Sequence, residues 1–279
     1  MEIFGTGIMK ISRFIIFLFI FTSAPVHADI MLLVHGFLGH AFSWERSGVN
    51  IELQRMGWQH AGMFEGSPYG PQLLVTQHNG ATNKVYTATL PSETPVIVQS
   101  DVLKNIIDIL QQYHPDEPLI LVGHSAGGVV ARMLLVRHQP KNIKALITIA
   151  SPHVGTARAD QVLDITANHG PFNFVKEFIG GDDYDSLQHS RGLMHDLMYP
   201  KPGNMLYWLN SQPHPDIHYA SIIRVDKDRE AGDKYVPAFS QNMNNVPALM
   251  GRSSVYITPA SHFLVPEDAI TIVSILSRW

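Results

Sequence analysis

Residues 119–132 read Leu-Ile-Leu-Val-Gly-His-Ser-Ala-Gly-Gly-Val-Val-Ala-Arg, and this stretch decides the fold. Apolar residues flank a glycine-rich centre on both sides, which predicts a buried strand, a very tight turn and a helix. Gly123 and Gly127 flank Ser125 at the G-x-S-x-G spacing, where strand and helix must pass close to the serine. Such a turn exposes the serine hydroxyl above the first helical N–H groups. The alternative is a glycine-rich loop that happens to contain serine, but the strand and helix around it favour a nucleophile.

Composition excludes several classes of protein. The chain has 279 residues, of which 45% are hydrophobic, and this is ample for a packed core. A formal net charge of −4 argues against nucleic acid or a polybasic membrane surface as partner. The absence of cysteine excludes a disulfide framework, a thiolate nucleophile and a Cys-ligated zinc. Since there are 15 histidines, only position in the chain can identify a catalytic one.

The first 28 residues have the pattern of a secretory signal peptide. Lys10 and Arg13 form a basic region, 14–21 is an apolar run, and 26–28 supply a small-residue cleavage site. The apolar run is shorter than the roughly 20 residues of a membrane span, although a retained membrane anchor is the alternative. We therefore expect an exported protein, periplasmic or secreted, whose residues 29–279 form a single α/β domain.

Strands and helices are expected to alternate along most of the chain. Strands are expected over 29–34, 85–90, 119–124, 143–150, 218–225 and 254–257, and helices over 41–56, 94–113, 126–138 and 266–278. This alternation predicts a mostly parallel, doubly wound sheet with right-handed crossovers. The segment 57–83 is expected to be irregular, with a short hairpin near 73–75.

The alternation stops between residues 157 and 217. A connection of about 60 residues is far longer than usual in a compact domain, and this one is rich in apolar and aromatic side chains such as Phe172 and Trp208. In open α/β folds, ligands bind at the carboxyl edge of the sheet. We therefore expect a helical cap or lid over that edge, contacting an apolar substrate, rather than a passive packing insert.

A serine hydroxyl is a weak nucleophile unless a base removes its proton and an acid orients that base. In this topology the acid follows the serine in the chain and the histidine comes last. His262 lies in the loop after the last expected strand, and it is the only histidine after His218. Position therefore selects His262 as the base.

The acid is expected just beyond the strand that ends at residue 225. The acidic residues there are Asp226, Asp228, Glu230 and Asp233. Asp233 is favoured because it precedes Pro237 by four residues, so that the loop returns directly into a packed turn. Asp226, which lies closest to the strand end, is the alternative.

An oxyanion hole needs two backbone N–H donors. One should be Ala126, directly after the nucleophile, and the other should come from the loop after the first strand, where Phe37 is the natural donor. His35, His124 and His153 crowd the same edge of the sheet. Because none of them follows Asp233, we expect structural hydrogen bonds rather than catalysis from these three histidines.

Several stretches together resemble α/β-hydrolases of the bacterial lipase and esterase type. Residues 34–39 (VHGFLG) resemble the oxyanion loop of that family, and 123–128 (GHSAGG) resemble its nucleophile elbow. Residues 149–156 resemble the segment after the next strand in lipases and in related inositol-deacylase-like hydrolases. Asp233 with Val-Pro at 236–237 is similar to the acid loop of the family, and His262 matches its late histidine.

The resemblance implies an exported serine hydrolase that cleaves carboxylic esters of acyl lipids through a Ser125–His262–Asp233 triad and needs no cofactor. A phospholipase, a thioesterase or an acyltransferase would use the same residues, and a non-catalytic lipid-binding protein is the alternative from another class. Two features depart from the family. The segments 57–83 and 157–217 match nothing in it, and the disulfide and calcium loop of some lipases have no counterpart that we can identify here.

Overall fold

The computed structural model describes residues 29–67, 69–76, 83–168, 188–226 and 231–279. The expected signal peptide at 1–28 lies outside this range. None of the helices in the described residues is long and apolar enough to cross a membrane.

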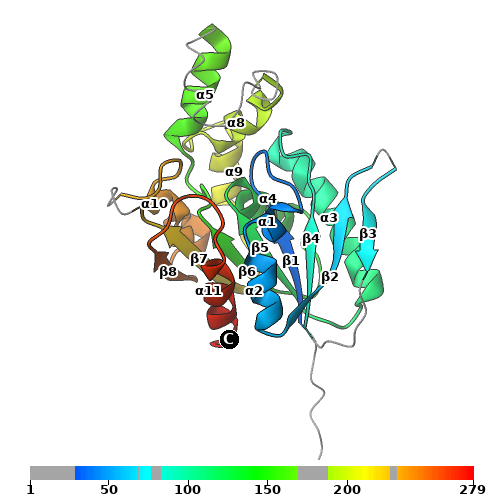
Figure 1. The fold of residues 1–279 in the computed structure, drawn as a ribbon. Helices are drawn as coiled ribbons and strands as arrows, with labels where there is room; N and C mark the ends of the chain where they lie inside the picture. Colours follow the sequence, from blue (N-terminus) through cyan, green and yellow to red (C-terminus); the bar gives the residue numbers. More distant parts are fainter. Residues whose placement is uncertain (1–28, 68, 77–82, 169–187, 227–230) are drawn as a thin grey trace, which may run out of the picture.

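The described residues contain one eight-stranded sheet in the order β3-β2-β4-β1-β5-β6-β7-β8 (Figure 1). The strands are β1 (Ile30–Val34), β2 (Trp58–Glu65), β3 (Gln72–Thr76), β4 (Asn83–Ala88), β5 (Leu119–His124), β6 (Ile143–Ile149), β7 (His218–Arg224) and β8 (Ser253–Thr258). All neighbours pair in parallel except β2 and β3, which form an antiparallel edge. The prediction of a mostly parallel α/β sheet is confirmed.

Helices cover both faces of this sheet. They are α3 (Val96–Tyr113) and α4 (Ala126–Arg137) on one face, and α1 (Ser43–Arg46), α2 (Val49–Arg55) and α11 (Glu267–Leu276) on the other. Strand β1 shows why its sequence is continuously apolar. Leu32 packs toward α3 and α4, whereas Met31 and Leu33 belong to the cluster of α2 and α11, and all five of its residues are buried.

The expectation of irregular structure over 57–83 is wrong for most of the described part. It contains β2 and β3, which extend the sheet beyond β4, and the hairpin expected near 73–75 is the β2–β3 pair. The sequence pattern does not predict β2, because His60 and Gly62 interrupt its apolar residues. Its pairing with β4 shifts register at this point. The longer strand is held by its neighbours rather than by its own periodicity.

The helix expected over 41–56 is in fact two helices, α1 and α2. Gly48 separates them with a φ of +81°, in the left-handed region that glycine adopts readily. A side chain there would also meet Pro266, whose Cγ lies 3.1 Å from the position of an added Cβ. The break lets the chain turn closely past the start of α11.

The described part of the segment 157–217 forms helices α5 (Ala157–Asn168), α8 (Arg191–Leu197) and α9 (Met205–Ser211). Figure 1 shows α5 and α8 beyond one end of the strands, above the helical layers. Helix α8 packs on α5 and α9, and the Asp196 carboxylate accepts a hydrogen bond from the Val96 N–H at the start of α3 (2.8 Å). These contacts join α8 to the body of the protein.

Candidate active site

Ser125 lies in the sharp turn between β5 and α4 with a strained backbone, φ 51° and ψ −126°. Its N–H donates to the carbonyl of Ile149 (2.8 Å), which ties the turn to β6. Gly123 and Gly127 are required because other backbone segments pass too close to them to leave room for a side chain. A Cβ on Gly127 would lie 2.3 Å from the His35 carbonyl oxygen, and one on Gly123 would lie 2.5 Å from the Gly128 Cα.

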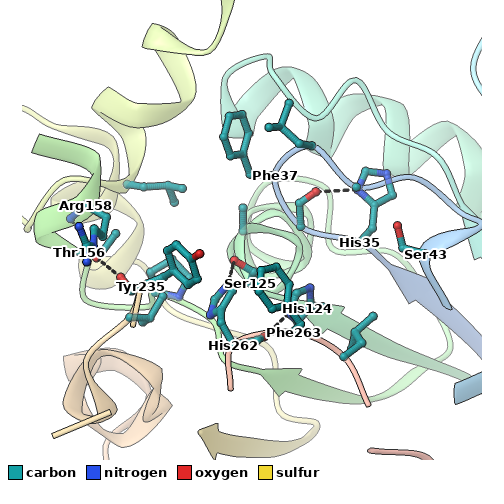
Figure 2. A pocket seen from close by; sticks show the side chains of 18 of the residues that line it. His35, Phe37, Ser43, His124, Ser125, Thr156, Arg158, Tyr235, His262 and Phe263 are labelled. Carbon is teal, nitrogen blue, oxygen red and sulfur yellow. Dashed lines mark hydrogen bonds between the residues drawn. The ribbon is translucent and has the colours of Figure 1, made fainter. Parts of the chain in front are cut away.

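The structure brings Ser125, His262 and Asp233 together in a hydrogen-bonded chain. The Ser125 Oγ lies 2.9 Å from His262 Nε2, and His262 Nδ1 lies 2.9 Å from the Asp233 Oδ2. The three residues come from the β5–α4 turn, the loop after β8 and the loop after β7. Figure 2 shows the imidazole beside the serine hydroxyl. With Nδ1–H donating to Asp233, Nε2 can accept the serine proton.

The Asp233 carboxylate is held by its own loop. Its Oδ1 accepts the N–H groups of Tyr235 and Val236 at 2.7 Å each. Asp226 instead uses its N–H to donate to the Gly232 carbonyl (3.1 Å), and no hydrogen bond joins its carboxylate to His262 in the described residues. The candidates Asp228 and Glu230 lie outside the described residues. The geometry therefore favours Asp233 as the acid.

The two expected oxyanion donors, Phe37 and Ala126, line the same pocket as Ser125. Ala126 is the first residue of α4, so its N–H has no carbonyl acceptor one turn earlier. The loop after β1 approaches the serine so closely that a Cβ on Gly36 would lie 2.8 Å from the Ser125 Cβ. This approach places the backbone of that loop beside Ser125, and Figure 2 shows Phe37 on the far side of Ser125 from His262.

Two further histidines hold loops of the site. His35 donates from Nδ1 to the Gly36 carbonyl (2.8 Å) and accepts the Leu90 N–H at Nε2 (2.9 Å), and burial lowers its pKa to about 4. His124 donates from Nε2 to the backbone carbonyl of His262 (2.8 Å), and burial lowers its pKa to about 3. Both rings are therefore neutral at pH 7, and neither occupies the position of the base.

His153 belongs to a buried cluster around Arg132 of α4, which the sequence patterns do not indicate. The Arg132 guanidinium lies 3.4 Å from His153 Nδ1, 3.2 Å from His214 Nε2 and 2.9 Å from the Asn210 Oδ1. Burial lowers the pKa of Arg132 to about 9. Asn210 also donates to the His153 carbonyl (3.0 Å), so the cluster joins α4, the loop after β6 and α9.

Ser125 and His262 line a cavity of about 590 Å³. Apolar side chains of α5 and α8, Ala159, Met194 and Leu197, line one part of it. Polar side chains of α1 and its C-terminal end, Ser43, Arg46 and Ser47, line another part. In the described part of the chain, no group of three or more histidine, aspartate and glutamate side chains is placed to hold a metal ion.

A protein-family model matches part of the chain. The model of the family described as "PGAP1-like alpha/beta domain" matches residues 60–184, which include Ser125 but neither Asp233 nor His262. No curated protein matches the sequence significantly.

Solved structures resemble the whole described fold at low sequence identity. The product of the gene lin2722 of Listeria innocua is 15% identical with a TM-score of 0.63, and the match covers 90% of this chain and 95% of that one. The mature Bacillus licheniformis lipase BlEst2 is 15% identical with a TM-score of 0.59, and the match covers 91% of this chain and 93% of that one. A thermostable carboxyl esterase of Bacillus coagulans is 14% identical with a TM-score of 0.52, and the match covers 90% of each chain. In its fold, a mostly parallel eight-stranded sheet between helices, the chain resembles these bacterial lipase and esterase structures.

Proposed function

We propose that this protein is a serine hydrolase that cleaves carboxylic esters. The observation that carries the proposal is the hydrogen-bonded chain from Asp233 through His262 to Ser125, which ends in a cavity large enough for an acyl ester. The fold shared with lipases and esterases supports the same reaction class.

In the proposed mechanism, His262 Nε2 takes the proton of Ser125 as the oxygen attacks the ester carbonyl. Asp233 accepts from Nδ1–H and stabilises the imidazolium that forms. The N–H groups of Phe37 and Ala126 bind the oxyanion of the tetrahedral intermediate. His262 then protonates the leaving alcohol, and water repeats the sequence to release the acid from the acyl-enzyme.

The lining of the cavity favours acyl lipids as substrates. Ala159, Met194 and Leu197 offer an apolar surface for an acyl chain, which supports a role for α5 and α8 as a substrate cap. The polar side chains of α1 suit the alcohol part of the ester. A long acyl chain presented at a lipid interface is the expected natural form of the substrate.

The nucleophile is tested with purified protein, nitrophenyl acyl esters and a fluorophosphonate probe. Wild type should turn over the esters and be labelled, whereas Ser125→Ala should do neither. Absence of labelling in the folded wild type, or equal turnover by Ser125→Ala, would contradict the proposal and would favour a non-catalytic lipid-binding protein.

Substrate class is tested with an acyl-chain-length profile, measured with and without a lipid interface. Preference for long chains at an interface supports a lipase, and preference for short soluble esters identifies an esterase instead. Phospholipid, thioester and acyl-acceptor assays distinguish the phospholipase, thioesterase and acyltransferase alternatives, which would use the same triad.

The acid is tested by comparing Asp233→Asn with Asp226→Asn. Asp233→Asn should lower kcat by about 10³ to 10⁴-fold, because the amide no longer orients the imidazole or stabilises its charge. Asp226→Asn should remain close to wild type. The reverse ranking would move the assignment to Asp226.

We also propose that residues 1–28 direct export of the protein. Expression of the full chain in a Gram-negative host, followed by fractionation and N-terminal sequencing, should recover a periplasmic or secreted form that begins at Asp29. A membrane-bound form that retains these residues would instead indicate an anchor.

A further inference from the structure

Gln241, the last residue of α10 (Ala238–Gln241), is buried beside the candidate acid, with 1% of its surface exposed. Its Nε2 donates to the Asp233 Oδ2 (3.2 Å) and to the Val236 carbonyl (2.8 Å). Its Oε1 accepts the N–H of Arg224, the last residue of β7 (2.7 Å), and Nε2 also approaches the Arg224 carbonyl (3.3 Å). One side chain therefore connects the acid with β7.

The neighbours of this amide leave it a single orientation. A flipped amide would set its NH₂ group against the Arg224 N–H, and its oxygen against the Asp233 carboxylate and two carbonyls. Donor would face donor, and acceptor would face acceptor. The Asp233 Oδ2 thus receives two N–H donors, from Gln241 and from His262, and both orient the same oxygen.

Arg224 carries the connection on to the loop of the histidine. Its guanidinium Nη2 bonds both oxygens of Asp268 on α11 (2.5 and 2.6 Å), and Nη1 donates to Thr258 Oγ1 (2.7 Å). Asp268 also accepts the Val265 N–H (2.9 Å). Thr258 and Val265 are the two ends of the segment that contains His262, so one buried arginine bonds one end directly and the other through Asp268.

A buried ion pair adds little to stability compared with apolar residues of the same size, because removing two charges from water is costly. Arg224 and Asp268 are 1% and 0% exposed. Their directional bonds do, however, fix the distance between two loops, and catalytic geometry tolerates errors of only about 0.5 Å. Arg224 and Asp268 lie between the loop of Asp233 and the loop of His262. This position explains why a charged pair, rather than two apolar side chains, occupies the buried site.

We infer that Gln241 is a positioning residue that sets the Asp233 carboxylate against His262, with Arg224 and Asp268 holding the histidine loop in the same frame. The inference rests on the proposed function. Gln241 does not touch the substrate cavity, so its loss should lower kcat without weakening substrate binding.

The test begins with Gln241→Met, which keeps the volume of the side chain and removes both N–H donors. We expect kcat to fall about 10 to 100-fold with KM within twofold of wild type. Gln99→Met is the matched control, because Gln99 is 2% exposed and its side chain, among the described residues, bonds the carbonyls of Ser92 and Thr94 just before α3. It should lose similar stability and keep wild-type kcat.

Gln241→Glu supplies a readout that a merely structural role would not give. When protonated, its carboxyl group donates to Asp233 as the amide does, and when ionised it sets a second carboxylate against Asp233. The ratio of its kcat to that of wild type should therefore rise as the pH is lowered from 8 to 6, whereas the ratio for Gln241→Met should stay flat. The low-field proton resonance of His262 Nδ1–H should shift in either variant.

Wild-type kcat in a folded Gln241→Met, or equal loss in Gln241→Met and Gln99→Met, would overturn the inference while leaving the triad in place. An unchanged Nδ1–H resonance in Gln241→Met would overturn it as well, and this readout needs only folded protein. If wild type itself shows neither turnover nor fluorophosphonate labelling, the proposed function fails and the inference fails with it.

Discussion

His124 Nε2–H donates to the backbone carbonyl of His262 at 2.8 Å, although the two residues lie 138 positions apart in the chain. The two rings also contact each other, with centroids 5.2 Å apart. His124 directly precedes Ser125, so this bond sets the loop of His262 against the turn that carries Ser125. The lowered pKa of His124 keeps the ring neutral at pH 7, and the neutral tautomer with a proton on Nε2 is the one that donates.

His124→Phe should therefore lower kcat while leaving the protein folded. Phenylalanine retains ring packing on His262 and loses only the donor, a loss of about 1–2 kcal/mol that corresponds to about tenfold in rate. The kcat of both proteins is measured by the turnover of nitrophenyl esters. His218→Phe is the control. His218, the first residue of β7, is exposed and its ring stacks on Trp279, so this variant should keep wild-type turnover. Equal turnover in both variants would exclude a positioning role for His124.

Gly127→Ala should destabilise the protein severely. The added Cβ would lie 2.3 Å from the His35 carbonyl oxygen, and a backbone atom cannot yield as the end of a side chain can. We expect a loss of about 2–4 kcal/mol in the free energy of unfolding, together with loss of activity. Denaturant unfolding measures the first quantity. Gly66→Ala, at an exposed site with no heavy atom within 4 Å of the added Cβ, should be nearly neutral.

The sequence is informative where one local constraint decides the structure. The G-x-S-x-G turn needs glycines where a strand and a helix pass close to Ser125, and a parallel strand buried on both faces, such as β1, forms a nearly continuous apolar run. The order of serine, acid and histidine then leaves His262 as the single late candidate. The structure places Ser125, His262 and Asp233 within hydrogen-bond distance, as their order in the chain suggests.

Other features depend on contacts between distant segments. Strand β2 is held by β4 and β3, and its own residues show no clear alternation. Gln241 and Arg224 are ordinary polar residues in the sequence, and only the folded chain brings their amide and guanidinium groups between two loops. Arg132 is similar, since its partners His153, Asn210 and His214 come from two segments far from it in the chain. No pattern in one segment reports on such partners.

Acidification should destabilise the protein below about pH 6.5. Burial lowers the folded-state pKa of four histidines: His35 to about 4, His124 and His214 to about 3, and His153 well below its usual value. The unfolded chain therefore binds more protons between pH 6.5 and about 4, and each histidine removes up to about 1.4 kcal/mol of stability per pH unit in this window. Asp196 and Asp268, whose folded pKa values are raised, act in the opposite sense, but two carboxyls offset only part of four histidines.

Denaturant unfolding at pH 7, 6, 5 and 4.5 measures this slope. His214→Gln should reduce it by about 1.4 kcal/mol per pH unit, because glutamine does not titrate and its oxygen still accepts from Arg132. A stability that is flat between pH 6.5 and 4.5 would contradict the buried neutral state of these histidines.

Asp196 should control how firmly α8 is held over the cavity. Its carboxylate caps the first N–H of α3 at Val96, and Met194 and Leu197 of the same short helix line the cavity beside Ser125. Asp196→Ala removes the acceptor and should cost about 1 kcal/mol of stability. We expect KM for long-chain esters to rise severalfold, with kcat for short esters unchanged. Asp196→Asn keeps an acceptor oxygen and should restore KM.

Burial raises the folded pKa of Asp196 to about 6, so the carboxyl group is largely neutral at pH 5. The difference in the free energy of unfolding between Asp196→Asn and wild type should therefore shrink as the pH falls from 7 to 5. A chain-length dependence of KM that is identical in all three proteins would show that the cap on α3 does not set the position of α8 over the substrate.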